Sequence, residues 1–161
     1  MGFFKLLYAI LLTIAPISEL RIGLPVAITY AIENNIPLLL IFTMILLVNL
    51  ITVFFIFLFL DFFHSIFMNW KFYRKGFNWY IKRFQNKIKR FNKKYDKLGF
   101  LALVFLVAIP LPGTGAWTGS ILSWALKLDR KKSILAICMG VIIAGLLVFL
   151  GTLGFINIFQ K

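Results

Sequence analysis

Two short polar segments contain residue types that could bind a substrate, although most of the chain around them is apolar. The first reads Ser18-Glu19-Leu20-Arg21. Glu19 could carry a proton or bind a cation, and Arg21 could hold an anionic group, with Ser18 beside them. Because side chains at i and i+2 do not face each other on a helix, a direct Glu19–Arg21 pair requires non-helical backbone. The alternative is a structural pair that shapes a turn.

The second polar segment extends from residue 110 to residue 120 and combines prolines, glycines and hydroxyl side chains. The prolines end one helix, the glycines permit positive φ and close approach, and a following helix would direct its N–H groups at the turn as a weak anion site. The alternative is a tight turn with a glycine packing contact. The candidate substrate-binding or ion-binding residues of this segment are Pro110, Pro112, Gly113, Thr114, Gly115, Trp117 and Thr118.

Outside these segments, few polar residues are candidates for chemistry. Asn49 lies in the middle of a long apolar stretch and suits either a substrate contact or a hydrogen bond between helices. Asp61 and His64 are three residues apart, which fits a proton relay but favours an interfacial pair. Cys138 and His64 are the single residues of their types, and the sequence contains no P-loop or catalytic motif. We therefore predict no metal site, no cofactor and no enzymatic activity.

The composition indicates that these residues lie in a membrane. Hydrophobic residues make up 61% of the 161 positions, against about 45–50% in soluble domains. Residues 37–60 and 133–156 are long apolar stretches that would each extend about 36 Å as a helix, enough to span a bilayer. We predict an all-α integral membrane protein with a single membrane domain, residues 1–161.

Four other apolar segments are too short to span a hydrocarbon core of roughly 30 Å. They are residues 2–15, 22–32, 98–109 and 117–126. The first two flank an interruption from Ala15 to Pro25, and the last two flank the second polar segment. This pattern favours two re-entrant hairpins whose turns meet near the midplane, buried in protein or lining a wet cavity.

Each predicted hairpin is followed by one spanning helix, so the chain divides into two units of inverted orientation, which is typical of transporters. The first unit is residues 1–64, the second is residues 98–161, and a basic amphipathic helix over residues 65–97 joins them. This helix would lie in the headgroup layer or form a coiled-coil-like seam in a homodimer. A small-residue packing face, within or between chains, consists of Ala136, Gly140 and Ala144.

The distribution of charge indicates the orientation. The chain has 18 Lys and Arg residues against 5 Asp and Glu; eleven basic residues lie within residues 71–97, and another cluster lies within residues 127–132. Basic loops mark the cytoplasmic side and attract anionic lipid headgroups. We therefore place the linker 70–97 and the loop 127–132 in the cytoplasm, and both termini outside the cell membrane. Because the clusters adjoin apolar segments, nucleic acid is not an expected partner.

The sequences Ser-Glu-Leu-Arg-Ile-Gly-Leu-Pro at 18–25 and Pro-Leu-Pro-Gly-Thr-Gly-Ala-Trp-Thr-Gly-Ser at 110–120 resemble those of the small multi-drug export protein family. Ile22 departs from the family pattern, which has small residues after Glu-Leu-Arg. The family is in turn similar in architecture to the DedA-like (VTT-domain) lipid transporters, which pair re-entrant hairpins with embedded acidic and basic residues. The resemblance implies transport.

These observations predict a membrane transporter whose small amphipathic or lipid-like substrate meets Glu19, Arg21 and the 110–120 turn at the midplane, with proton or ion coupling. Arg21 and the half-helix N-termini favour an anionic head group, whereas Glu19 and the aromatic residues suit a lipophilic cation. On this chemistry we expect an anionic or lipid-type substrate, whereas the family resemblance points to a cationic one. One alternative is a DedA-like flippase or scramblase of a phosphate-bearing lipid carrier. Another is a non-transporting scaffold that uses the basic helix.

Overall fold

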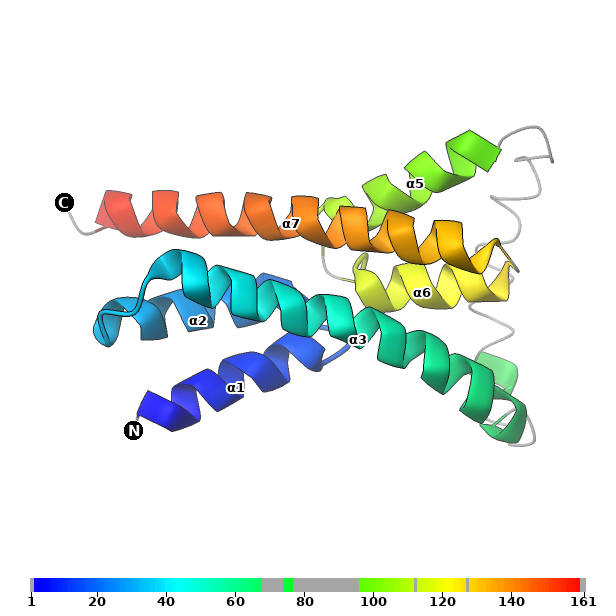
Figure 1. Ribbon diagram of the computed structural model, residues 1–161, viewed down its shortest axis with the longest axis horizontal. Coiled ribbons are helices and arrows are strands. Elements are labelled where there is room, and N and C mark those ends of the chain that lie inside the picture. Colours follow the sequence, from blue (N-terminus) through cyan, green and yellow to red (C-terminus); the bar gives the residue numbers. More distant parts are fainter. Residues whose placement is uncertain (1, 68–73, 77–95, 112, 127, 160–161) are drawn as a thin grey trace.

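The computed structural model describes residues 2–67, 74–76, 96–111, 113–126 and 128–159. The described residues fold as helices, as predicted. Most of the predicted amphipathic helix over residues 65–97 lies outside them. The six helices labelled in Figure 1 are α1 (Gly2–Ile14), α2 (Glu19–Glu33), α3 (Leu38–Phe67), α5 (Asp96–Ala108), α6 (Ala116–Ala125) and α7 (Arg130–Phe159).

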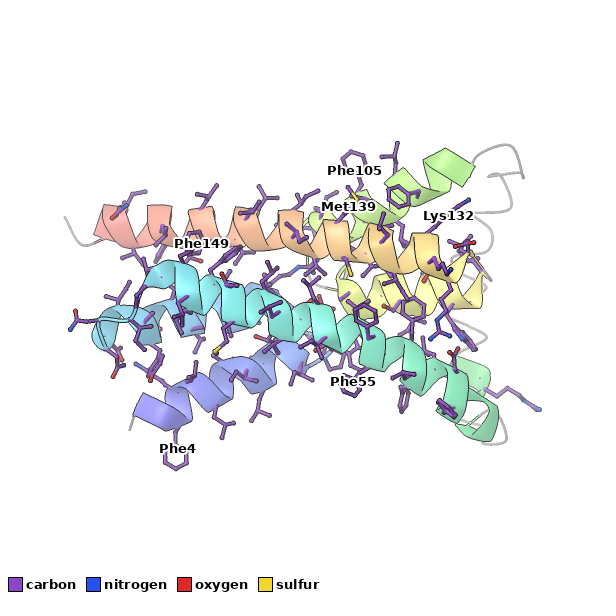
Figure 2. All side chains as sticks on the ribbon, viewed as in Figure 1. Phe4, Phe55, Phe105, Lys132, Met139 and Phe149 are labelled. Atoms are coloured by element: carbon purple, nitrogen blue, oxygen red, sulfur yellow. The ribbon has the colours of Figure 1, made fainter. Side chains whose placement is uncertain are left out.

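The two long helices, α3 and α7, agree with the predicted spanning stretches. Each contains a segment long and apolar enough to cross a membrane, Leu38–Phe62 in α3 and Arg130–Ile158 in α7. Figure 2 shows apolar side chains on the outside of the helix bundle as well as in its interior. The Phe55 side chain points outward, whereas the Phe149 side chain lies between α7 and α3. The Phe149 ring centroid is 4.9 Å from that of Phe42. Large apolar side chains therefore cover the outside as well as the core, as a lipid solvent permits.

The four short helices form two hairpins that approach each other along the long axis of the molecule. The α1–α2 hairpin lies at one end and the α5–α6 hairpin at the other, with their turns directed toward the middle (Figure 1). Helices α2 and α6 both pack against α3 and α7, while α1 packs on α2 and α3, and α5 packs on α6 and α7. The start of α1 and the end of α7 lie at the same end of the molecule (Figure 1).

The first interruption is shorter than the sequence predicts. We expected irregular backbone from Ala15 to Pro25, but α2 begins at Glu19 and continues through Pro25. A proline inside a membrane helix is tolerated where neighbouring helices compensate for the lost hydrogen bond. Gly23 serves a different purpose, because a Cβ atom there would lie 2.8 Å from the carbonyl oxygen of Ala9 and would also overlap Thr13 Oγ1. Its missing side chain lets α1 pack closely on α2.

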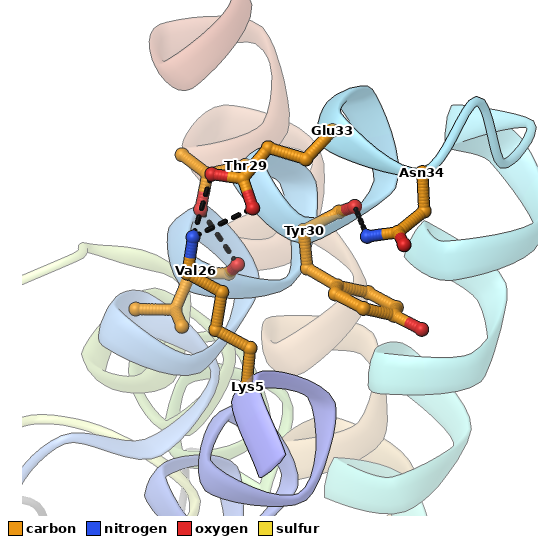
Figure 3. Close-up of polar contacts among 6 residues, drawn as sticks. All are labelled: Lys5, Val26, Thr29, Tyr30, Glu33 and Asn34. Atoms are coloured by element: carbon orange, nitrogen blue, oxygen red, sulfur yellow. Dashed lines mark hydrogen bonds and ion pairs between the residues drawn. The ribbon is translucent and has the colours of Figure 1, made fainter. Parts of the chain in front are cut away.

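The connection from α2 to α3 begins with a capped C-terminus of α2. The N–H groups of Asn35 and Ile36 donate to the carbonyls of Ile32 and Ala31, and Asn35 has φ 53°, the left-handed conformation that ends many helices. Figure 3 shows the Asn34 side chain donating to the carbonyl of Tyr30 over 2.9 Å. It also shows the ion pair between Lys5 Nζ and Glu33 Oε1, 2.6 Å apart, which joins α1 to the end of α2.

The central residue of the predicted small-residue face on α7, Gly140, packs within the chain against α5. Ala136, Gly140 and Ala144 are buried, and a Cβ atom at Gly140 would lie 2.6 Å from Val107 Cβ and 2.9 Å from the carbonyl oxygen of Val104. A backbone oxygen cannot move aside as a flexible side chain can. The close approach of α5 to α7 therefore depends on a glycine at this position.

Replacing Gly140 with alanine should destabilise the protein by about 2 kcal/mol, because the added methyl group overpacks this contact. The free energy of unfolding in an SDS titration from mixed micelles measures the effect. Gly151 lies on the same helix and has open space around its position, so Gly151→Ala should be neutral or slightly stabilising. Equal effects of the two substitutions would contradict this account of the α5–α7 contact.

Candidate functional site

The carboxylate of Glu19 reaches from the first hairpin to the second. Its two oxygens accept hydrogen bonds from the backbone N–H groups of Ala116 (3.2 Å) and Trp117 (3.1 Å) at the start of α6. Glu19 is only 6% exposed. A negative charge at a helix N-terminus satisfies N–H groups that have no partner within the helix and complements the helix dipole. Glu19 therefore caps a helix of the other hairpin.

Gly115 makes room for this carboxylate. A Cβ atom at position 115 would overlap both oxygens and the carboxyl carbon of Glu19. The position needs a glycine for space, since its φ of −101° is open to other residues. The backbone of Glu19 itself has φ 48°, a left-handed conformation that is unfavourable for a residue other than glycine. Such strain at a buried charged residue favours a functional role.

The guanidinium of Arg21 also crosses to the second hairpin. Nη1 donates to the carbonyl of Leu111, and Nη2 lies 3.0 Å from the carbonyl oxygens of both Ile109 and Thr114. Nη2 is also 3.4 Å from the carbonyl of Val107 and 3.1 Å from Thr114 Oγ1. The four carbonyls lie at the C-terminal end of α5 and in the turn after it. Carbonyls at the end of a helix have no N–H partner within the helix, so a positive charge is favourable there.

The end of α1 is satisfied in the same way, by side chains from other parts of the chain. Its last carbonyls accept hydrogen bonds from a hydroxyl, an amide and an indole N–H. The three bonds are Ser18 Oγ to Leu12 (2.6 Å), Asn49 Nδ2 to Thr13 (3.3 Å) and Trp117 Nε1 to Ile14 (3.0 Å). Asn49 thus acts between helices, and Trp117 joins both hairpins, because its backbone N–H also binds Glu19.

The second turn is held by its own hydroxyl groups. Thr114 Oγ1 lies 2.9 Å from the carbonyl oxygens of both Ile109 and Leu111, and Thr118 Oγ1 donates to the carbonyl of Gly113 over 2.7 Å. Gly113 has φ 78°, which glycine adopts without strain. Pro110 is exposed on this turn, and Pro112 lies outside the described residues.

The structure brings most of the candidate residues into one cluster, here called the hairpin junction. The junction consists of Ser18, Glu19, Arg21, Asn49, Thr114, Gly115 and Trp117 with the backbone that they bind. The N–H groups expected to form an anion site at the start of α6 bind Glu19 instead. The sequence reasoning missed Thr13, a buried hydroxyl that donates to Ala9. A threonine inside an otherwise apolar limb was the available signal.

Asp61 belongs to a separate polar cluster near the C-terminal end of α3. Its Oδ1 accepts a hydrogen bond from Trp124 Nε1 (3.1 Å), and its Oδ2 forms an ion pair with Arg130. The Arg130 guanidinium carbon is also 5.6 Å from the ring centroid of Phe57. Asp61 therefore links α3 to α6 and α7. The side chain of His64, its predicted neighbour, lies outside the described side chains.

One family model matches most of the chain. A family model described as "Putative small multi-drug export protein" matches residues 19–147, which begins at Glu19 and includes Arg21 and the second turn. No curated protein and no solved structure shows significant similarity to the chain. Within the described residues, two helices are apolar enough to span a membrane. Since the matched region covers most of the sequence, the chain belongs to the small multi-drug export protein family.

Proposed function

We propose that the protein exports a small amphipathic or lipid-like substrate through the hairpin junction, which lies at the bilayer midplane between two re-entrant hairpins. One observation carries the proposal: the two charged residues of the first hairpin bind the broken backbone of the second. Charged side chains at membrane depth are expensive and usually mark substrate or ion pathways. Broken helices that meet at the midplane are the usual way in which transporters build a site.

The arrangement of the helices supports an inverted, re-entrant topology. The hairpins approach from opposite ends (Figure 1), and exchanging α1, α2 and α3 with α5, α6 and α7 gives the same set of contacting helix pairs, although α1 packs mainly on α2 whereas α5 packs mainly on α7. The limbs are too short to cross a core of about 30 Å. In this topology the basic segments 70–97 and 127–132 face the cytoplasm and contact anionic lipid, and both termini lie outside.

The contacts of Glu19 and Arg21 suggest how transport works. Because both residues bind the other hairpin, rocking one unit against the other must break these hydrogen bonds. Protonation of Glu19 removes the charge that holds the start of α6, and this provides a route for proton coupling. Arg21 holds the second turn while its guanidinium donates to the carbonyls there, and releases the turn when those hydrogen bonds break. In this mechanism the hydrogen bonds of the junction fix the two units to each other, and protonation of Glu19 and substrate binding break them.

The two alternatives make different demands on these residues. A DedA-like flippase of a phosphate-bearing lipid needs a guanidinium or N–H groups that can face the phosphate, whereas here Arg21 and the start of α6 are bound within the protein. A non-transporting scaffold needs the basic linker, with or without a second copy of the chain. It needs no charge at Glu19 or Arg21.

Flux in reconstituted vesicles tests the proposal. Glu19→Gln and Arg21→Ala should each lower the flux of transported compounds about tenfold or more, because each removes a charge-assisted contact of the junction. Thr29→Ala, at an exposed position on α2 whose hydroxyl donates to Val26 of the same helix, is the control and should keep normal flux. A panel of lipophilic amines and labelled phospholipids covers both substrate classes. Normal flux in both junction variants, with folding verified by gel filtration, would rule out transport through the hairpin junction.

A further inference from the structure

Five oxygen atoms surround the guanidinium of Arg21. Four are the backbone carbonyl oxygens of Val107, Ile109, Leu111 and Thr114, and the fifth is Thr114 Oγ1. We call them the oxygen cluster. Carbonyl oxygens only accept hydrogen bonds, and at the end of a helix they carry partial negative charge. The cluster therefore suits a cation that carries several N–H donors.

The shape of the oxygen cluster is fixed largely by the second turn itself. The N–H of Leu111 donates to the carbonyl of Ile109 (2.8 Å), and the N–H of Thr114 donates to the carbonyl of Leu111 (3.2 Å). Thr114 Oγ1 bridges the same two carbonyls at 2.9 Å. A cluster held by its own hydrogen bonds is preorganised, and it can persist while one cation replaces another.

Apolar surface lies directly beside the oxygen cluster. The side chains of Ile109 and Leu111 are 48% and 56% exposed, although their carbonyls bind Arg21. A ligand with a cationic head and an apolar body would place the head on the oxygens and the body against these side chains. Sites for small amphipathic molecules combine apolar walls with a few oriented polar groups in this manner.

We propose that the oxygen cluster is the binding site for the substrate's head group, that Arg21 occupies it as an internal ligand in the resting protein, and that the exported substrate is an amphipathic cation with an ammonium or guanidinium group. The inference rests on the proposed function and adds the substrate class to it. Because one cation replaces another on the same oxygens, the charge on the cluster is unchanged by the exchange. A phosphate would be repelled by the same oxygens.

Chemical rescue of Arg21→Ala tests the site directly. The variant empties the cluster, so methylguanidinium at millimolar concentration should raise its thermal unfolding midpoint by several degrees and leave the wild-type midpoint unchanged. Tetramethylammonium at equal ionic strength carries the same charge without N–H donors and should have no effect. A rise of equal size with both ions, or no rise with either, would overturn the proposal.

Further variants separate the oxygen cluster from other places where methylguanidinium could bind. Adding Thr114→Val to Arg21→Ala removes one of the five oxygens and should weaken rescue about tenfold, whereas adding Glu19→Gln should preserve rescue. Arg130→Ala removes an arginine from the exposed carboxylate of Asp61 and should show no comparable rise. If Arg21→Ala does not fold, Arg21→Lys takes its place, since its ammonium carries three N–H donors against the five of a guanidinium and leaves part of the cluster without a donor. Rescue that depends on Glu19 instead of Thr114 would contradict the assignment.

Flux measurements then distinguish this inference from the proposed function. Wild-type vesicles should export an alkylguanidinium or alkylamine faster than the chain-matched quaternary ammonium compound, and should not move a labelled anionic phospholipid. Movement of the phospholipid alone would leave the transporter intact and refute the cationic substrate. If none of the compounds moves, the proposed function fails, and the rescue experiment alone decides whether the cluster binds cations.

Discussion

Gly115→Ala should destabilise the folded protein by about 3 kcal/mol, because the new methyl group takes the space of the Glu19 carboxylate. The carboxylate must then leave the N–H groups of Ala116 and Trp117, and charge-assisted hydrogen bonds of this kind contribute about 1.5–3 kcal/mol each. The free energy of unfolding by SDS titration measures the loss. Flux should fall as well, since the junction loses its cap on α6.

Gly113 provides the matched control for this substitution. It lies two residues away and has φ 78°, but nothing lies within 4 Å of a Cβ atom built there. Gly113→Ala should therefore show only the backbone strain, about 1 kcal/mol. If Gly113→Ala destabilised the protein as much as Gly115→Ala does, backbone conformation and not the space for Glu19 would explain both results.

Glu19→Ala should have an effect of similar size, about 3 kcal/mol or more. The substitution leaves two N–H groups of α6 without their acceptor and removes the negative charge nearest to Arg21. The same SDS titration applies. Glu19→Gln should fall between alanine and wild type, because its amide oxygen can accept one of the two hydrogen bonds.

The backbone conformation of Glu19 gives this prediction an internal control. Alanine and glycine both delete the carboxylate, but at φ 48° only glycine is free of strain. Glu19→Gly should therefore be about 1 kcal/mol more stable than Glu19→Ala, the reverse of their usual order inside a helix. The usual order would show that position 19 is an ordinary helical residue and that the strain is absent.

The helices themselves were largely predictable from the sequence. Long apolar runs identify α3 and α7, and the lengths of the shorter runs identify the four hairpin limbs to within a few residues. The start of α2 is the exception, since Pro25 was expected to end the irregular segment but lies inside the helix. Local rules treat proline as a helix breaker, whereas membrane helices can accommodate it because neighbouring helices compensate for the missing hydrogen bond.

The candidate site was predictable in its residues but not in its bonding. Glu19 and Arg21 were singled out because charge is rare in an apolar chain, and both lie in the junction. Their partners are 86 to 98 positions away in the sequence, and no local spacing encodes such pairing. For this reason we expected the N–H groups at the start of α6 to be free to bind an anionic ligand, whereas a carboxylate of the other hairpin binds them. Gly115 could be recognised as special, but only the structure shows what fills the space beside it.

The reciprocal capping of the two hairpins has a consequence for biosynthesis. The first hairpin leaves the ribosome long before residues 107–117 exist, so in the proposed topology Glu19 and Arg21 enter the bilayer without their acceptors and donors. A charged side chain at the centre of a membrane helix is disfavoured by about 2.5–3.5 kcal/mol on insertion scales. A leucine or isoleucine returns only about 0.3–0.6 kcal/mol, so the short limbs offset this cost with little surplus. Stable integration should therefore wait for the second half of the nascent chain, and a prematurely terminated polypeptide should be recognised and degraded by membrane quality control.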